Sequence, residues 1–87
     1  MPDFNGSTDS LPNLILCIAQ MLVDNPDEVK VSEIKGEHTT VLELKVGNGD
    51  LGKIIGKSGR NAQAIRTILN GASTKLRRRT VLEIVDL

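Results

Sequence analysis

Residues 52–66 read GKIIGKSGRNAQAIR. Gly56 and Gly59 enclose Lys57 and Ser58, with apolar residues before the first glycine and helical spacing of apolar residues after the second. Two glycines let the backbone turn sharply between helices, and they let a sugar-phosphate chain approach without a Cβ in its way. The segment therefore predicts a helix–loop–helix unit, in which residues 56–59 form what we call the GxxG loop.

The side chains around the GxxG loop suit a phosphate backbone. A helix that starts after the loop presents unpaired N–H groups and its positive dipole end. Lysines and arginines here would add cationic contacts, a serine would donate a hydrogen bond, and an isoleucine would lie beside the bases. The predicted nucleic-acid-binding residues are Gly56, Lys57, Ser58, Gly59, Arg60, Lys53, Ile54 and Ile55.

Two other phosphate-binding patterns overlap this stretch, and both fail on context. Gly47, Gly49 and Gly52 have the spacing of the dinucleotide fingerprint, but no acidic residue follows about 20 positions later to hold a ribose. The GKS run at 56–58 matches the end of a Walker A loop, whose first glycine would fall at position 51, where the chain has Leu51. We therefore interpret these glycines as turn residues.

Hydrophobic periodicity extends the pattern outward from the GxxG loop. Alternating apolar residues predict strands, and apolar residues three or four apart predict helices. The predicted elements are a helix over 10–23, strands over 29–34 and 39–46, a short helix ending at 55, a long helix from 59 or 60 to 76, and a strand over 81–87. This order, α-β-β-α-α-β, predicts an α+β fold with a three-stranded mixed sheet and three helices packed on one face.

The first predicted helix is apolar around nearly its whole circumference. Leu11, Ile15 and Leu22 share one stripe, whereas Leu16 and Val23 lie off it. Such a helix in a small domain usually has a second surface to cover, so we expect self-association or a protein partner. Cys17 lies in this helix and is interpreted as a small core or interface residue.

Charge is distributed unevenly along the 87 residues, although the formal net charge is zero. Residues 1–52 hold three Lys or Arg and nine Asp or Glu, whereas residues 53–87 hold eight and two. A polyanion responds to the local field, so the basic part is compatible with phosphate binding. Arg77, Arg78 and Arg79 are interpreted mainly as a solvated cluster after the long helix.

Composition excludes several classes of function. The sequence shows no Ser-His-Asp set, no convincing carboxylate pair and no metal-ligand cluster, and its single histidine, His38, has no cysteine nearby. We therefore expect no enzyme activity, metal or cofactor. The only aromatic residue is Phe4, which argues against modules that stack bases on aromatic rings. No apolar stretch reaches the roughly 20 residues that span a bilayer. We expect a cytoplasmic protein with a flexible tail over residues 1–9 and a single domain over 10–87.

The run at 52–66 resembles the KH motif, and the order of elements resembles its type II arrangement. From residue 11 to residue 87 the chain resembles the KhpA family of small bacterial KH-domain proteins, including residues 22–26 and the closing strand. The resemblance implies a cytoplasmic RNA-binding protein with RNA-chaperone character. It also implies homodimers, heterodimers with the larger KhpB (Jag) type of KH protein, and links to cell shape and cell-wall biogenesis.

Together these observations predict a binder of single-stranded RNA that grips the sugar-phosphate backbone through the GxxG loop and acts as a dimer. Two alternatives remain open from the sequence. The chain is alternatively a protein-interaction or dimerisation module with little nucleic-acid binding, or a binder of single-stranded DNA.

Overall fold

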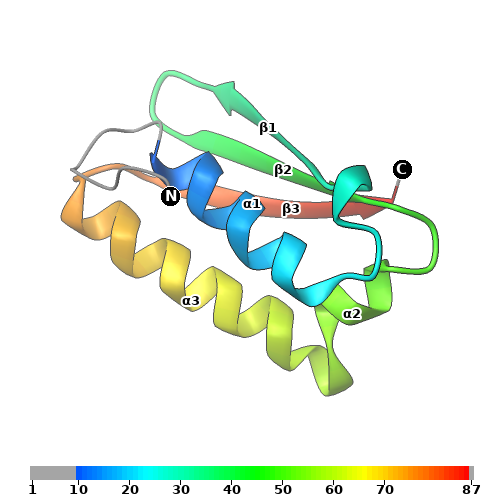
Figure 1. Cartoon of the computed structure of the whole chain (residues 1–87). Coiled ribbons are helices and arrows are strands. Elements are labelled where there is room, and N and C mark those ends of the chain that lie inside the picture. The colour runs from blue at the N-terminus through cyan, green and yellow to red at the C-terminus, as the bar shows by residue number, and fades with distance from the viewer. Residues whose placement is uncertain (1–9, 87) are drawn as a thin grey trace.

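A three-stranded sheet is the centre of the computed structural model, which describes residues 10–86. The strands are β1 (Lys30–Lys35), β2 (Thr40–Val46) and β3 (Thr80–Asp86), in the order β1-β2-β3 (Figure 1). β1 runs antiparallel to β2, with Lys30 opposite Lys45, and β3 runs parallel to β2, with Thr40 opposite Thr80. The sheet is therefore mixed.

The two kinds of pairing follow from the two kinds of connection. Residues 36–39 form a tight hairpin, closed by a 2.8 Å hydrogen bond from the Gly36 amide to the Thr39 carbonyl. A parallel pair needs a long crossover instead. That crossover contains α2 (Leu51–Ile55), the 3-10 turn η2 (Lys57–Gly59) and α3 (Arg60–Lys75). The GxxG loop thus lies in the middle of the crossover.

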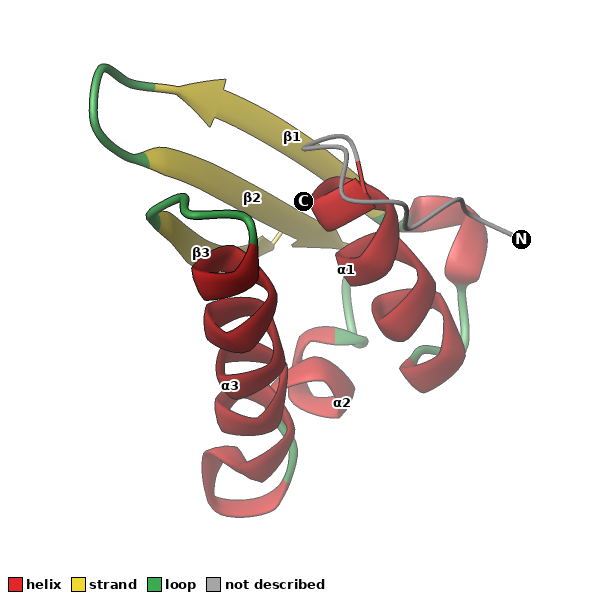
Figure 2. Ribbon diagram, turned by 90° about the vertical axis from the view of Figure 1, so that its left-hand side faces the viewer, coloured by secondary structure: helices red, strands yellow, loops and turns green. Residues whose placement is uncertain are grey.

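All three α-helices cover the same face of the sheet. Figure 2 shows α1 (Ser10–Leu22), α2 and α3 on one side of the strands, and no part of residues 10–86 covers the other side. Residues of β2 alternate between buried and half-buried, as expected for a strand with one covered face. The core lies between these layers and includes Leu11, Ile15, Ala19, Val29, Leu42, Leu44, Val46, Ile54, Ile65, Leu69 and Leu82.

The predicted fold class is confirmed, including the element order and the mixed sheet. One short element was not predicted, the 3-10 turn η1 (Pro26–Glu28), which starts with a proline between α1 and β1. Ile34 belongs to β1 but is 52% exposed, because it pairs with Val41 on the uncovered face of the sheet. The predicted tail over residues 1–9, with Phe4, lies outside the described residues.

Helix α1 buries one side and exposes apolar atoms on another. Ile15 and Ala19 are completely buried, whereas Met21 is 84% exposed. Cys17 is exposed as well, so it is not a core residue, and the alternative that it is an interface residue stays a prediction. The position of Cys17 one turn before Met21 places both on the outer side of the helix. No helix within residues 10–86 has the length and apolar character to cross a membrane.

Candidate nucleic-acid interface

The GxxG loop has a backbone that few residues other than glycine adopt. Gly56 has φ 78° and ψ 173°, a region that is almost restricted to glycine. Gly59 has φ 76° and ψ 13°, in the left-handed helical region, and Ser58 between them has φ 58°. Gly56 also ends α2, because its amide donates to the Gly52 carbonyl at 2.8 Å. The two glycines therefore produce the bend that the sequence predicts.

Asn61 holds the two sides of the bend together. Its Nδ2 donates a 2.9 Å hydrogen bond from the first turn of α3 to the Lys53 carbonyl in α2. A Cβ placed on Gly56 would lie 2.7 Å from Asn61 Cγ and 2.9 Å from Asn61 N. The absence of a side chain at position 56 is thus what allows Asn61 to approach. No sequence pattern that we used identified this contact.

The charged and polar side chains of the loop face solvent. Lys57, Ser58 and Arg60 are exposed, and the two glycines are half-buried. Within the described part of the chain, neither Lys57 nor Arg60 forms an ion pair. The unpaired backbone N–H groups in the first turn of α3, a 16-residue helix, lie next to the GxxG loop. A negatively charged ligand would therefore meet two cations and the positive end of a helix dipole.

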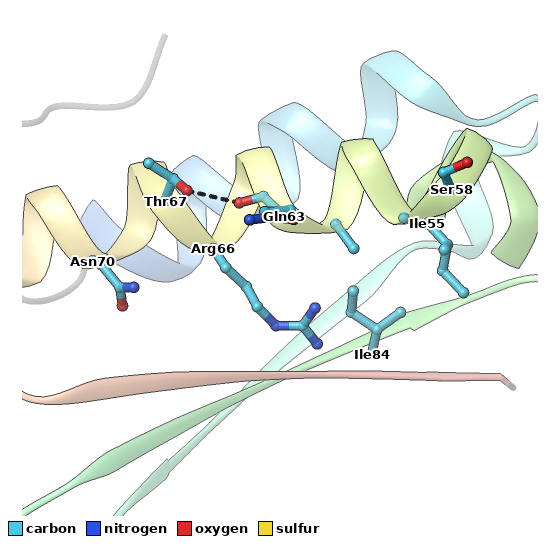
Figure 3. Close-up of a pocket in the computed structure, with 9 residues that line it drawn as sticks. Ile55, Ser58, Gln63, Arg66, Thr67, Asn70 and Ile84 are labelled. Carbon is cyan, nitrogen blue, oxygen red and sulfur yellow. Dashed lines mark hydrogen bonds between the residues drawn. The ribbon is translucent and has the colours of Figure 1, made fainter.

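An open groove of about 590 Å³ starts at the loop and runs between α3 and β3 (Figure 3). Its walls carry both apolar and polar side chains. The lining residues are Ile55, Ser58, Gly59, Ala62, Gln63, Arg66, Thr67, Asn70 and Ile84. The groove is continuous with the exposed face of the GxxG loop, since Ser58 and Gly59 belong to both.

The two predicted isoleucines lie on different sides of α2. Ile55 is 38% exposed and lines the groove, where it lies near Ile84 of β3 (Figure 3). Ile54 is completely buried and belongs to the core cluster. Of these two isoleucines, only Ile55 therefore offers an apolar surface in the groove, and Ile54 supports α2 from beneath.

Lys53 is engaged by acidic side chains rather than presented to the groove. Its Nζ lies 3.2 Å from Asp24 Oδ2 and 3.7 Å from Asp50 Oδ1. The hydrogen bond and charge of Asp24, assisted by Asp50, raise the pKa of Lys53 above its ordinary value of 10.5. The side chain does not line the groove. Lys53 thus joins the α1–β1 connection to α2, apart from the other predicted cations.

Asp50 anchors the same connection. It precedes α2 at the N-cap position, but its carboxylate makes no cap hydrogen bond. Instead Oδ2 accepts hydrogen bonds from Asn25 N at 3.1 Å and Asn25 Nδ2 at 3.2 Å. Burial raises the pKa of Asp50, but the hydrogen bonds from Asn25 and Asp24 with the charge of Lys53 outweigh burial and lower the pKa below 3.8.

Four polar residues of α3 that line the groove were missed from the sequence. Gln63, Arg66, Thr67 and Asn70 recur at intervals of three and four, which places them on one side of the helix. Figure 3 shows the Arg66 side chain extending from α3 toward Ile84. Their spacing was a usable signal, because a polar stripe beginning one turn after Gly59 continues from the loop.

Comparison with known proteins gives a consistent result. The sequence model of the family described as KhpA/KhpB, KH domain, matches residues 12–84 of this chain. A protein of Clostridium acetobutylicum is 52% identical over 75 residues, which cover 86% of this chain and 100% of that protein. A protein of Aquifex aeolicus is 49% identical over 77 residues, covering 88% and 98%, and one of Borreliella burgdorferi is 53% identical over 73 residues, covering 84% and 89%. All three relatives are named RNA-binding protein KhpA.

Proposed function

Because this chain belongs to the KhpA/KhpB KH-domain family, as its sequence resemblance predicted, we propose that it binds single-stranded RNA at the GxxG loop. The observation that carries the proposal is the loop itself, which is exposed, has two glycines at positive φ, and opens into the groove between α3 and β3. The names of the relatives support RNA as the ligand.

The proposed grip combines backbone contacts with a short apolar surface. The RNA backbone crosses Gly56 and Gly59, where no side chain obstructs it, and its phosphates meet Lys57 and Arg60. Ser58 donates a hydrogen bond. About four nucleotides fit a loop of this kind, and their bases lie along the groove beside Ile55.

Two of the predicted site residues act indirectly in this proposal. Ile54 packs beneath α2, and Lys53 ties α2 to the α1–β1 connection through Asp24 and Asp50. Both keep the loop in position, and neither contacts RNA. Direct contacts belong to Gly56, Lys57, Ser58, Gly59, Arg60 and Ile55.

The double substitution Lys57→Asp with Ser58→Asp tests the proposal. Reversing one charge and adding another next to the RNA backbone removes at least one charge-assisted contact, each worth about 1.5–3 kcal/mol. The expected result is a fall in affinity of about 100-fold for a single-stranded oligouridine, measured by fluorescence anisotropy at low salt. Circular dichroism checks that the variant is folded, which we expect because both side chains are exposed.

The matched control is Lys30→Asp with Ser32→Asp, which makes the same chemical changes on the uncovered face of β1. It should retain most of the affinity, apart from a small loss through the changed net charge. Equal losses in both variants, or none in either, would contradict binding at the GxxG loop. Competition between oligouridine and oligodeoxythymidine in the same assay separates an RNA binder from a DNA binder.

We further propose that the protein acts as a dimer through the outer side of α1. Met21 and Cys17 are exposed there, and Leu14 is half-buried on the same side. Two grooves joined in one particle would raise the affinity for a long RNA through effective concentration. The family resemblance also predicts RNA-chaperone activity, association with a KhpB-type partner, and links to cell shape and cell-wall biogenesis, and these stay predictions. A cytoplasmic location and the absence of enzyme activity stay predictions from the sequence.

A further inference from the structure

The groove beside the GxxG loop does not end at the middle of α3. Two further hollows follow it between α3 and β3, and a fourth lies between the turn after α3 and the β1–β2 hairpin. Each hollow shares lining residues with the next. The first and second share Arg66 and Asn70, and the second and third share Asn70, Thr80 and Val81. The third and fourth share Arg78 and Arg79. The surface is therefore hollowed along the whole of α3, which at about 1.5 Å per residue is roughly 24 Å long.

The far end of this extended groove is the turn after α3. Arg77 has φ 57°, a left-handed conformation that reverses the chain at this point. The Arg78 amide donates to the Ser73 carbonyl at 2.9 Å, and the Arg79 carbonyl accepts from the Thr40 amide at 2.9 Å. The turn is thus held by main-chain hydrogen bonds at both ends, and these bonds do not use the arginine side chains.

Those side chains form a dense positive surface. Arg77, Arg78 and Arg79 are exposed, and no ion pair involves them within residues 10–86. Glu37 and His38 of the β1–β2 hairpin border the same hollow without pairing with the arginines. Planar guanidinium groups bind phosphate in a bidentate manner, so three of them at the end of a groove favour an anionic ligand.

Two buried hydroxyl groups add an independent observation at the same place. Ser73 and Thr80 are 4% and 6% exposed, and both line the hollow that contains Arg78 and Arg79. Neither Ser73 Oγ nor Thr80 Oγ1 has a hydrogen-bond partner among the described residues. Buried polar groups without a partner are rare in folded proteins and commonly mark the position of a water or ligand.

We propose that the turn at residues 77–79 is a second phosphate site, which holds the same RNA strand beyond the nucleotides gripped by the GxxG loop. This inference rests on the proposed function, because the strand enters the groove at that loop. Arg66 lies between the two ends and neutralises the intervening backbone. The strand then lies parallel to α3, and Arg78 and Arg79 bind phosphates at its far end.

The length of the RNA provides the test. Three proteins are titrated with oligouridines of about four and ten nucleotides. They are the wild type, the double variant Arg78→Gln with Arg79→Gln, and the double variant Lys57→Asp with Ser58→Asp. We expect the wild type to bind the longer RNA at least about tenfold more tightly. The double glutamine variant should lose that gain and keep its affinity for the shorter RNA. Its salt slope on the longer RNA should fall by about 1.4, or about 0.7 for each lost phosphate contact.

A matched control removes two cations elsewhere. Lys30→Gln with Lys35→Gln changes the net charge equally on β1 and should keep the length dependence. The proposal of a second site is wrong if the double glutamine variant still binds the longer RNA as much more tightly than the shorter one as the wild type does, or if it loses affinity equally for both RNAs. In either case the GxxG loop remains as the binding site. If the wild type binds neither RNA, the proposed function fails and this inference fails with it.

A measurement on the wild type keeps the inference testable even if the double glutamine variant does not fold. Amide NMR shifts of residues 77–80 should change with the longer RNA and not with the shorter one, whereas those of residues 56–60 should change with both. Unchanged signals at residues 77–80 with the longer RNA would overturn the second site.

Discussion

Gly56 and Gly59 both have positive φ, yet they differ in what a side chain would meet. A Cβ at Gly56 would collide with Asn61, whereas a Cβ at Gly59 would have no atom within 4 Å. Gly56 also combines φ 78° with ψ 173°, which only glycine tolerates well, and Gly59 has the left-handed helical conformation, which costs other residues about 1–2 kcal/mol. The same substitution should therefore have unequal effects at the two positions.

We predict that Gly56→Ala lowers the free energy of unfolding by about 3 kcal/mol and Gly59→Ala by about 1 kcal/mol. Urea denaturation followed by circular dichroism measures both values, and the Gly59 variant serves as the control for changes in backbone preference alone. An equal or larger loss at Gly59 would show that the contact with Asn61 does not constrain position 56.

Single residues also show where sequence reasoning stops. The bend, its two glycines and the exposure of Lys57 and Arg60 agree with what spacing predicts. Spacing could not decide between Ile54 and Ile55, because a five-residue helix is too short to define a periodic face. It could not place Lys53 either, since its partner Asp24 lies 29 positions away in the chain.

At the scale of elements, the α1–β1 connection and α2 are joined by one buried carboxylate. Asp50 is 2% exposed and receives hydrogen bonds from Asn25. Because its pKa is lowered in the folded protein, its stabilising contribution is present above the ordinary value of 3.8 and is lost as the pH falls through the folded value. The joint between these elements should therefore weaken in acid.

We predict that Asp50→Asn lowers the thermal unfolding midpoint near neutral pH, and that the gap to the wild type narrows as the pH falls below about 4. Differential scanning calorimetry from roughly pH 7 to pH 2 measures this. Asp27→Asn is the control, because Asp27 is exposed in η1 and makes no side-chain hydrogen bond or ion pair within the described residues. A gap that stays constant with pH would contradict a role for the carboxylate charge.

The elements themselves were largely predictable. Alternation along β2 and β3 and the three-to-four spacing along α3 reflect one covered face, and glycine marks the ends of α2 and the hairpin. The turn η1 was missed because a three-residue turn is too short to show hydrophobic periodicity. The role of Asp50 was also out of reach of local patterns, because its partners Asp24 and Asn25 lie 26 and 25 positions earlier in the chain.

At the scale of the whole molecule, the groove could not be predicted because it needs two elements that meet only in the fold. Ile84 of β3 and Arg66 of α3 are 18 positions apart and line the same hollow. The charge asymmetry was visible in the sequence, but only the fold brings Arg66 and the turn at 77–79 onto one hollowed surface. Long-range packing, rather than local preference, creates the site.

The exposed side of α1 carries the prediction at this scale. We expect Met21→Glu to weaken self-association by at least about tenfold, because a charge would be buried without a partner at the proposed interface. Sedimentation velocity over a range of protein concentrations measures the change. Gln20→Glu adds the same charge to the adjacent exposed position and should sediment as the wild type does. Identical behaviour of the two variants would remove α1 from the interface.

The parallel pairing of β2 with β3 has a consequence for how the chain reaches this structure. Thr40 and Thr80 are 40 positions apart, so closing that pair costs more chain entropy than closing the β1–β2 hairpin, and it should come late in folding. A 16-residue helix such as α3 can form in about a microsecond, which shortens the crossover before the strands pair. The flexibility of the GxxG loop between α2 and α3 then affects how quickly β3 pairs with β2. The loop that we propose as the RNA-binding site would therefore also influence the folding rate.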